Sequence, residues 1–384
     1  MALVLNEEQT MLKESARGFL QEHAPLAQLR SLRDERDETG YSAASWREMV
    51  ELGWTGILVP EANGGLGFGH VGMGQVMEES GRTLTASPLF ATAIMGVSAI
   101  SLGGSDEQKK TLLPAIVEGS LTLAMALDEG PRHRPAQVST TATKIGNDFE
   151  LSGVKHFVAD GHSADKLVVS ARTNGEPGDR EGISLFLIDR EASGVEVERV
   201  IMADSRNAAV VKLNKVTVSE TALLGEADQG FSLIERLCDI ANAHLSAELL
   251  GISLEVLERT VEYMKERKQF GVLIGSYQGL QHRAAHLFSE IELAKSVVIK
   301  ALQALDEQAE GGDGNEASLL VSLAKAKVGE VATLATNESV QLHGGIGMTD
   351  EYDMGFYMKR ARVAEQMFGD QRFHQRRFAA LSGY

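Results

Sequence analysis

The sequence has few of the residues that form disulfides, metal sites, membrane spans or targeting segments. Its 384 residues include one cysteine, Cys238, which lies in a helical pattern away from any histidine pair and is interpreted as a core residue. No run of about eighteen apolar residues occurs that would cross a bilayer. The opening stretch MALVLNEEQTMLKESARGF lacks the basic segment and apolar block of a signal peptide. We therefore expect a cytoplasmic protein without a metal site or a membrane segment.

Positive charge is also scarce, because 37 Lys and Arg residues stand against 54 Asp and Glu residues and give a net charge of -17. This balance disfavours binding to nucleic acid or to an anionic membrane surface. A phosphate-bearing ligand would need a local basic cluster, and GPRHRP at 130–135 is one. On pattern alone, a solvated loop or an outer helix face is the more ordinary interpretation of such clusters. A second, interrupted cluster contains Lys359, Arg360, Arg362, Arg372, Arg376 and Arg377.

The hydrophobic period changes twice along the chain. Residues 1–120 have helical periodicity, and Asn6 with Gln9 is spaced as a capping pair, as is Ser105 with Gln108. With 43% hydrophobic residues, the whole chain is long enough for two or three packed units. The first of them is predicted to be an N-terminal helical domain.

Residues 121–228 have a period of two, in short β-rich runs such as DKLVVSART and ISLFLIDRE. Turn-forming residues separate the runs and no helical segment intervenes, which predicts an antiparallel β-domain and excludes a Rossmann unit. Helical periodicity returns over residues 229–384, beginning with one long helix over 231–270. The fold class is therefore α+β, with a C-terminal helical bundle as the third domain. Further helices are expected at 276–308, 315–342 and 355–380.

Four motifs occur in the order typical of one enzyme family. VPEANGGLG at 59–67 resembles the P-E-x-x-G-G-x-G turn of the acyl-CoA dehydrogenases, and LSGVKHFVAD at 151–160 resembles their G-x-K-x-W-I-T-N strand. RKQFGVLIGSYQGLQ at 267–281 and QLHGGIGMTDEYD at 341–353 resemble the R-x-x-F-G-x-x-I-x-x-x-Q and Q-x-x-G-G-x-G signatures. The chain resembles this family over its full length. The resemblance implies α,β-dehydrogenation of an acyl-CoA substrate, with hydride transfer to FAD and an electron-transfer acceptor protein as partner.

The resemblance also implies which residues bind FAD. Arg267 would present a planar guanidinium to the pyrophosphate, and Phe270 would pack against the cofactor with Gln278 nearby. In the family these groups reach the flavin of a neighbouring subunit, so a homo- or hetero-tetramer is implied. Taken singly, Arg267 is equally consistent with a helix-end cation, and Phe270 with a core residue. The backbone at Gln341, Gly344 and Gly345 would close on the adenosine diphosphate, although the glycines also fit a helix C-cap.

The motifs for the chain's own flavin depart from the family pattern. The A-x-T-E-P-x-x-G-S-D segment reads ALDEGPRHRP, with Asp128 in the place of Thr and no G-S-D. W-I-T reads FVA, which places Phe157 where Trp is expected. A carboxylate at Asp128 would oppose reduction of the flavin ring unless it is turned away. Arg132, His133 and Arg134 are candidates to replace the missing phosphate donors.

Three interpretations follow from these departures. The chain forms a working homo-oligomer with an unusual flavin pocket, or it is one subunit of a mixed oligomer with a related chain. The second interpretation agrees with its similarity to a bacterial branch with SAELLG and FGD motifs, in which two chains pair and bulky acyl groups are handled. The third interpretation is a catalytically incomplete relative that serves as a scaffold or acyl-CoA-binding subunit.

The catalytic base is the least certain part of the site. The Glu of the family's Y-E-G-T segment falls on Phe368, and a second known position falls on Ala241, so neither can remove a proton. Asp370 is expected to point elsewhere. Two helical turns beyond Ala241, Glu248 lies on an apolar stripe, where a raised pKa would suit a base. We predict that Glu248 is the base or that a partner supplies it, with a buried ion pair as the alternative for Glu248.

Overall fold

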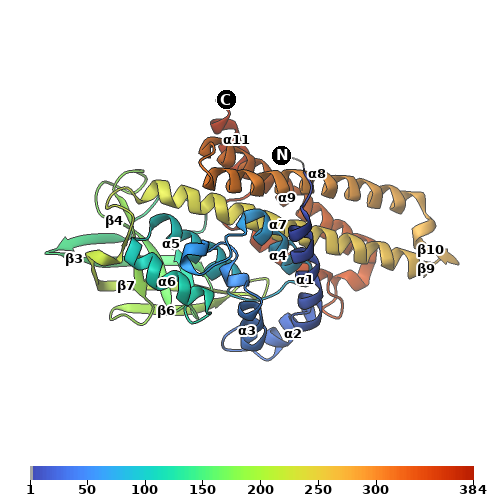
Figure 1. Cartoon of the computed structure of the whole chain (residues 1–384). Helices are drawn as coiled ribbons and strands as arrows, with labels where there is room; N and C mark the ends of the chain where they lie inside the picture. The colour runs from blue at the N-terminus through green and yellow to red at the C-terminus, as the bar shows by residue number, and fades with distance from the viewer. Residues whose placement is uncertain (1–2) are drawn as a thin grey trace. The chain divides into compact units, whose positions relative to one another are not determined.

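The computed structural model describes residues 3–384, which contacts divide into two compact units (Figure 1). Unit 1 contains the chain up to Ser31 together with His70–Thr85 and Asn242–Tyr384, and unit 2 contains Leu32–Gly69 and Ala86–Ala241. Each unit thus combines stretches that lie far apart in the sequence. The α+β fold class is confirmed, with helical N- and C-terminal segments and a β-sheet between them.

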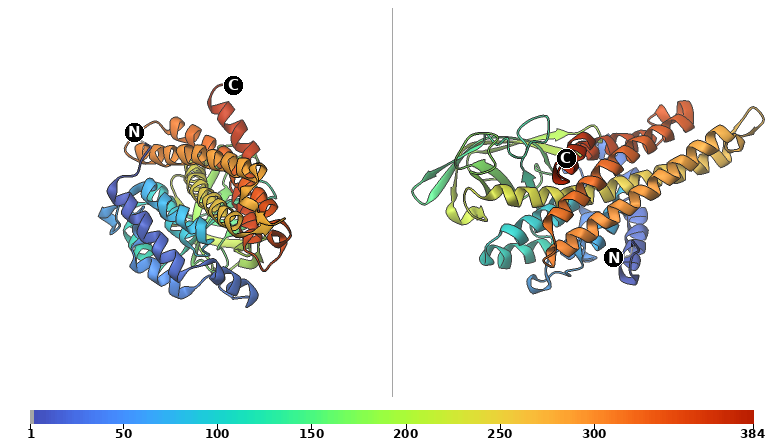
Figure 2. Two further views of the ribbon diagram at one scale, coloured as in Figure 1. Left: turned by 90° about the vertical axis from the view of Figure 1, so that its right-hand side faces the viewer. Right: turned by 90° about the horizontal axis from the view of Figure 1, so that it is seen from above.

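Unit 1 is built on long helices. Helices α8 (Gln278–Ala309) and α9 (Gly314–His343) pack side by side, as Figures 1 and 2 show. Helix α9 also packs against α10 (Met354–Gln366) and α11 (Gln371–Leu381). The predicted helix over 355–380 is therefore two helices, because Phe368 and Gly369 adopt positive φ values of 54° and 108° that a helix cannot contain.

The other helices of unit 1 follow the predicted signals. Helix α1 (Glu7–His23) begins with the expected capping box: Asn6 Oδ1 accepts from the Gln9 amide at 2.8 Å, and Gln9 Oε1 accepts from the Asn6 amide at 3.1 Å. The remaining helices of this unit include α4 (Gly69–Thr83), most of α2 (Leu26–Asp34) and the larger part of α7 (Gly230–Glu266).

Helix α7 is the long helix predicted over 231–270, but it ends at Glu266, where a short hairpin begins. Its composition and length pass a test for membrane spans, and 89% of the window that passes lies buried inside the protein. Buried core helices pass the same test, so the burial of α7 explains its apolar composition.

An eight-stranded sheet dominates unit 2 in the described part of the chain, in the order β6-β7-β3-β2-β4-β5-β8, with β1 beside β4. Most neighbours are antiparallel as predicted, but β1 and β2 both pair parallel with β4, so the sheet is mixed. Phe149 and Phe186 meet edge to face in its core with ring centroids 5.1 Å apart. The strands are β1 (Leu123–Ala126), β2 (Thr141–Ile145), β3 (Asp148–Ala159), β4 (Lys166–Arg172), β5 (Ile183–Asp189), β6 (Val195–Ile201), β7 (Asn207–Ser219) and β8 (Leu223–Leu224).

Short helices complete unit 2. Helix α6 (Asp106–Val117) begins with the predicted Ser105–Gln108 capping box. The glycine-rich turn before α4 is structural, because a Cβ at Gly65 would lie 2.1 Å from the Val59 carbonyl oxygen. The other helical elements are α3 (Ala43–Glu51), η1 (Trp54–Gly56), η2 (Glu61–Asn63), the π-helical η3 (Leu89–Gly96), α5 (Val97–Gly103) and η4 (Glu220–Ala222).

Candidate functional site

A β-hairpin at the end of α7 carries the first predicted FAD contacts. Strands β9 (Lys268–Gln269) and β10 (Val272–Leu273) pair across a two-residue turn in which Phe270 and Gly271 both have positive φ, as in type I′ hairpins. Phe270 is 93% exposed, so it is not a core residue of this chain. The exposed side chain of Arg267 has no hydrogen-bond or ion-pair partner within residues 3–384. Both side chains are available to a ligand or another subunit.

The remaining contacts of this group lie at the same end of unit 1. A small apolar cluster of Met264, Ile274 and Leu342 joins the end of α7, the start of α8 and the end of α9. This cluster brings the Arg267 hairpin close to the α9 end, and the sequence resemblance could not show that. Gln278, Gln341, Gly344 and Gly345 are all exposed there.

The glycines after α9 have different roles. Gly344 is the C-cap of α9 with φ 65° and ψ -142°, a backbone conformation that strongly favours glycine, so the capping alternative applies to it. A Cβ added at Gly344 or Gly345 would meet nothing within 4 Å. The packing of the chain therefore does not require Gly345 to be glycine, and the surface above both residues is open. We call the exposed group Arg267, Phe270, Gln278, Gln341, Gly344 and Gly345 the end surface of unit 1.

Asp128 begins the loop that departs from the family motif, and it faces a histidine. Its oxygens lie 3.1 and 3.2 Å from Nδ1 of His133, and Nε2 of His133 lies 3.9 Å from Sγ of Cys238. Cys238 is buried as predicted, and it also contacts this loop. The Asp128 carboxylate is therefore occupied by a donor from its own loop.

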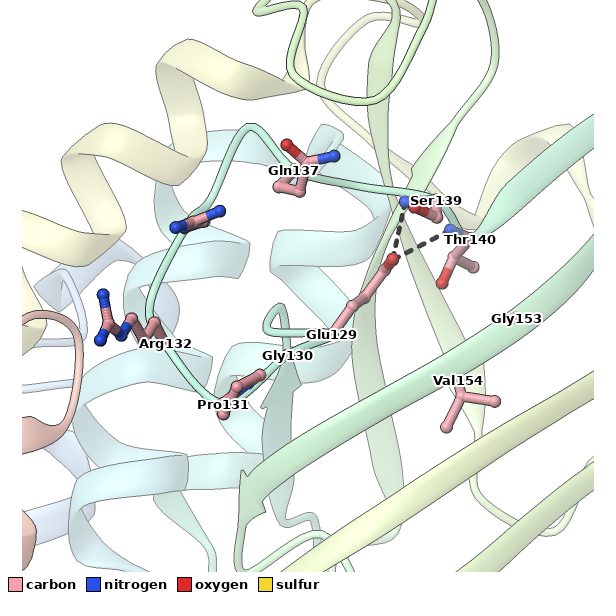
Figure 3. Close-up of a pocket in the computed structure, with 10 residues that line it drawn as sticks. Glu129, Gly130, Pro131, Arg132, Gln137, Ser139, Thr140, Gly153 and Val154 are labelled. Atoms are coloured by element: carbon pink, nitrogen blue, oxygen red, sulfur yellow. Dashed lines mark hydrogen bonds between the residues drawn. The ribbon is translucent and has the colours of Figure 1, made fainter.

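Glu129 holds the far end of the same loop. Its carboxylate accepts hydrogen bonds from the backbone amides of Ser139 at 2.6 Å and Thr140 at 3.0 Å, as the dashed lines in Figure 3 show. Lys155, which is fully buried, donates to Glu129 Oε1 at 2.7 Å and to Ser170 Oγ at 2.9 Å. We refer to residues 128–139 as the 128–139 loop.

The Glu129–Lys155 pair is ionised at neutral pH. Burial lowers the pKa of Lys155 to about 8 against the opposing effect of the Glu129 carboxylate. Burial raises the pKa of Glu129, but the Lys155 ammonium and the hydrogen bonds from Thr140 outweigh burial and leave this pKa below its usual value. The sequence contained one signal for this pair, since a period of two places Lys155 on the same face of β3 as the buried Leu151.

An open cavity of about 560 Å³ lies along this loop (Figure 3). Its lining includes Arg132, Arg134, Gln137, Ser139, Thr140 and Gly153. A buried arginine, Arg172, fixes the second half of the loop by donating to the carbonyl oxygens of Val138 at 3.0 Å and Ala136 at 3.1 Å. Arg172 binds three further carbonyls, of Asn174, Asp179 and Glu181, and no sequence motif identified this role.

Phe157 lies at a β-bulge in β3, where the register with β7 shifts between Lys155 and Val158. Its φ is 55° and its side chain is 58% exposed. A bulky residue rarely adopts positive φ, and bulges of this kind often direct a side chain toward a functional site. The structure thus presents an aromatic ring where the family pattern has Trp.

The position of the family's base lies in the break between α10 and α11. The carbonyl oxygen of Phe368 accepts from Asn242 Nδ2 at 3.2 Å, and that of Met367 accepts from Lys325 Nζ at 2.7 Å. Lys325 also donates to Oδ1 of Asn242 at 2.9 Å, and both side chains are buried. Asp370 does point elsewhere, because its carboxylate caps α11 by accepting from the Phe373 amide at 2.7 Å.

Glu248 forms the buried ion pair that was the alternative to its role as the catalytic base. Its two carboxylate oxygens accept from Nε and Nη2 of Arg360 at 2.8 and 2.7 Å, and both side chains are almost fully buried. A carboxylate held by both oxygens on a guanidinium is poorly placed to take a proton from a substrate. The ion-pair alternative for Glu248 is therefore favoured, with a partner supplied by an arginine 112 residues away, and its role as base stays a prediction.

Sequence and structure comparisons agree on the relatives of this chain. Models of the acyl-CoA dehydrogenase N-terminal, middle and C-terminal domains match residues 6–120, 125–213 and 228–381. Acyl-CoA dehydrogenase FadE12 from Mycobacterium tuberculosis strain H37Rv is 31% identical over 86% of this chain and 85% of its own. The CarC subunit of the caffeyl-CoA reductase-Etf complex from Acetobacterium woodii is 28% identical over 94% of both chains.

Among solved structures, a variant of the Tcur3481-Tcur3483 steroid ACAD superimposes with a TM-score of 0.85. Its sequence is 31% identical, and the match covers 98% of both chains. The chain belongs to the acyl-CoA dehydrogenase family, whose members are FAD-dependent oxidoreductases.

Proposed function

We propose that this chain is one subunit of a mixed tetramer with a related chain, and that the assembly converts an acyl-CoA thioester to the trans-enoyl-CoA. The observation that carries the proposal is an imbalance within unit 1. The end surface of unit 1 has the complete FAD-contact motif with its groups exposed, whereas the base position holds Phe368. The other two candidate positions hold Ala241 and the ion-paired Glu248. The partner would therefore supply the base that removes the α-proton.

The residues of the end surface fit the diphosphate of FAD. Arg267 offers a planar guanidinium that has no partner among the described residues and whose donors suit paired phosphate oxygens. Gly344 and Gly345 leave open space where a Cβ would otherwise project, so a ligand can approach the backbone there. Phe270 would cover the cofactor, and Gln278 and Gln341 would add amide groups. When bound, FAD would supply the acceptor for the hydride that leaves the β-carbon.

The residues of unit 2 fit the ring of the chain's own flavin less well. Asp128 brings a carboxylate where the family has a hydroxyl donor, although His133 occupies that carboxylate. Phe157 offers an exposed ring without the hydrogen-bond donor of Trp. We therefore propose that the chain alone binds FAD weakly and that its main contribution is made through the end surface of unit 1.

The relatives support the wider features of the proposal. The Tcur3481-Tcur3483 protein carries a paired name and is described as a steroid ACAD, which favours a bulky acyl group for this chain. The relative from Acetobacterium woodii is named as part of a reductase-Etf complex, which favours an electron-transfer protein as partner.

A second candidate function is a scaffold or acyl-CoA-binding subunit without catalysis. One observation favours it, namely that all three candidate base positions of this chain are inert or occupied. This candidate differs from the first in whether the assembled tetramer turns over substrate.

The test is to purify the chain alone and after co-expression with a related homologue, and to record the flavin absorbance and native mass of each. We expect a colourless or weakly loaded protein alone, and a yellow mixed tetramer that forms enoyl-CoA. A stoichiometrically loaded, active homo-oligomer would overturn the mixed-tetramer proposal. A flavin-loaded mixed tetramer without turnover would support the scaffold function.

A further inference from the structure

The segment that follows α9 leaves this helix and then returns to it. Residues 344–353, which we call the strap, begin with the 3₁₀ helix η6 (Gly344–Met348) and end at the start of α10. Near the end of the strap, the ring centroid of Tyr352 lies 4.8 Å from that of His343, the last residue of α9. Two glycines of the end surface therefore belong to a loop that contacts α9 at both of its ends.

Two arginines from other helices of unit 1 hold the end of the strap. Arg30 on α2 donates to the main-chain oxygen of Asp350 at 2.6 Å and to Oδ1 of Asp353 at 2.9 Å. Arg259 on α7 donates to Oδ2 of Asp353, also at 2.9 Å. Both carboxylate oxygens of Asp353 are therefore bound by arginines that lie 323 and 94 residues away in the sequence.

The carboxylate of Asp353 binds these arginines in place of an ordinary helix contact. Asp353 is the N-cap residue of α10, where an aspartate side chain commonly accepts a hydrogen bond from a backbone amide of the first turn. Within residues 3–384 its side chain makes no such bond. Because a side-chain cap would stabilise α10, its replacement by the two arginine contacts indicates that this carboxylate serves the strap.

The two arginines are themselves packed on aromatic rings near the start of α10. Cζ of Arg30 lies 4.6 Å from the centroid of the Phe356 ring, and Cζ of Arg259 lies 5.3 Å from that of the Tyr357 ring. The side chains of Arg30 and Asp353 are 25% and 31% exposed, so water screens their attraction less than it does on an open surface. The guanidinium groups therefore have fixed positions, and they fix the end of the strap.

The start of the strap is less restrained by packing than its end. A Cβ added at Gly344 or Gly345 would meet nothing within 4 Å, so packing does not fix the backbone there. The strap is restrained further along, where Gly347 lies against α9, at the Tyr352 ring and at the two arginines. The conformation of the backbone at the first two glycines therefore depends on these later contacts.

We propose that Arg30 is a positioning residue for FAD, which acts through Asp353 and the strap without touching the cofactor. By holding the strap, Arg30 keeps the backbone at Gly344 and Gly345 in the conformation that the diphosphate of FAD meets. The inference rests on the proposed function, because it takes the end surface as the FAD contact. It also goes further, because it assigns part of the FAD affinity to α2, a helix that carries none of the four family motifs.

The test measures the dissociation constant of FAD by fluorescence titration of the FAD-depleted assembly, whether this assembly is a homo-oligomer or a mixed tetramer. The variants are R30Q, R30K and the control K327Q. Lys327 has a side chain that is also 25% exposed, and it forms an ion pair with Glu290 between α9 and α8. It lies 16 residues before the end of α9, which is about 24 Å of helix away from the strap.

We expect R30Q to raise the dissociation constant of FAD about tenfold, because the strap loses a contact that fixes its end. R30K should recover only part of the affinity, since one ammonium cannot replace a planar guanidinium at both Asp350 and Asp353. K327Q should bind FAD as the wild type does, although it also loses an ion pair. Circular dichroism checks that each variant is folded.

Double variants separate positioning from general destabilisation. G345A places a methyl group where the ligand approaches the backbone, and this group would meet nothing within 4 Å in the chain itself. Because Arg30 acts through this backbone, R30Q should cost much less affinity in G345A than in the wild type. Arg267 belongs to a separate hairpin, so R30Q should cost the same factor in R267A as in the wild type.

An unchanged FAD affinity in R30Q would overturn the inference, and so would an equal loss in K327Q or an undiminished cost of R30Q in G345A. Absence of FAD binding from every assembly of the wild type would also overturn it. Enoyl-CoA formation by the mixed tetramer is measured separately. If that reaction is absent while R30Q still weakens FAD binding, the proposed function fails and the inference about Arg30 stands.

Discussion

The end surface of unit 1 and the 128–139 loop of unit 2 differ in whether their polar and aromatic side chains have partners within the described residues. On the end surface, Arg267 has no partner within the described residues, and Phe270 is almost fully exposed on a left-handed turn. In the 128–139 loop, Asp128 is matched with His133, and Glu129 with Lys155. The first segment keeps the family motif and the second departs from it.

This difference shows that a binding motif requires more than the right residue types, because its side chains must also be free to bind. Groups that serve a ligand or a neighbouring subunit remain unsatisfied in the isolated chain, because their partner comes from outside. In the 128–139 loop Asp128, Glu129 and His133 have partners inside the chain, so they hold the loop in shape. Whether the polar side chains have hydrogen-bond or ion-pair partners therefore distinguishes the end surface from the 128–139 loop more clearly than sequence similarity does.

The largest effect is expected where charges are matched most completely, at the Glu248–Arg360 pair in the interior of unit 1. Arg360→Met leaves the Glu248 carboxylate buried without its guanidinium, which should lower the free energy of unfolding by about 3–5 kcal/mol. Urea denaturation followed by circular dichroism measures this loss. The control is Arg362→Met, two residues further along α10 and exposed, which should leave the unfolding curve almost unchanged.

The same pair decides the remaining question about Glu248. In the flavin-loaded assembly, Glu248→Gln should weaken folding and leave the turnover of the folded fraction intact. If Glu248→Gln instead abolishes enoyl-CoA formation while substrate binding is retained, Glu248 is the base. A charged side chain with a partner inside the chain would then serve the substrate as well.

The next largest effect is expected at Arg267, whose side chain is exposed. Arg267→Ala should not change folding stability, because the side chain has no partner to lose among residues 3–384. It should weaken FAD binding by about 1.5–3 kcal/mol, a factor of roughly 10 to 150. Arg267→Lys should recover only part of this affinity, since an ammonium cannot form the bidentate contact. Flavin fluorescence during dialysis of the assembled protein measures the change.

The matched control for Arg267 is Lys265→Ala, two residues earlier and also exposed, which should keep full flavin occupancy. If Arg267→Ala also keeps full flavin occupancy, Arg267 does not contact FAD. The contrast between the end surface and the 128–139 loop would then no longer hold.

The smallest effect is a difference in acid sensitivity between the units. In unit 1, Nδ1 of His70 lies 3.1 Å from Nε2 of His244. Burial lowers the pKa of His70 to about 4, and burial together with His70 lowers the pKa of His244 well below its usual value. Between pH 6.5 and 4 the unfolded chain therefore binds protons that the folded chain does not, and stability falls as the pH falls.

Unit 2 should respond less, through His162, whose pKa is also lowered by burial. The lowered pKa of Glu129 supplies stability above the usual carboxyl pKa of 4.5, and this stability is lost only as the pH falls below that value. Near the histidines, burial raises the pKa of Asp306, which acts in the opposite sense and stabilises the fold as that carboxyl takes up its proton. Protonation of Asp306 therefore offsets part of the stability that the two histidines lose at low pH.

We expect His70 alone to lower the free energy of unfolding by about 2 kcal/mol between pH 7 and pH 5, with unit 1 losing more stability than unit 2. His70→Gln should flatten this dependence, whereas His282→Gln, on the exposed face of α8, should keep the wild-type slope. An unchanged slope in His70→Gln would mean that the buried histidines do not govern acid sensitivity.

The sequence predicted the features that depend on neighbouring residues. Both capping boxes were visible because their donors and acceptors lie three residues apart. The residues proposed to contact FAD could be named because the family motifs are contiguous in the chain. The break at Phe368 was not visible, because Asn242 and Lys325, which hold it, come from α7 and α9 far away in sequence.

The same limit applies to the candidate site. The pairing of Glu248 with Arg360 joins residues on α7 and α10, and periodicity alone could place Glu248 on an apolar stripe but could not name its partner. The contact of His133 with Cys238 spans 105 residues, so the loop cluster at 130–135 gave no hint that it is anchored to a helix. The parallel pairing of β1 with β4 was missed for the same reason.

The break between α10 and α11 has a consequence for how such proteins change over generations. Asn242 and Lys325 hold the turn through main-chain oxygens of Met367 and Phe368, and through nothing that depends on the identity of the side chain at 368. Exchange of that side chain therefore leaves the anchoring of the turn in place. A duplicated gene can lose or regain a proton-abstracting carboxylate by a change at one codon, and two descendants can then divide the labour of one reaction between them.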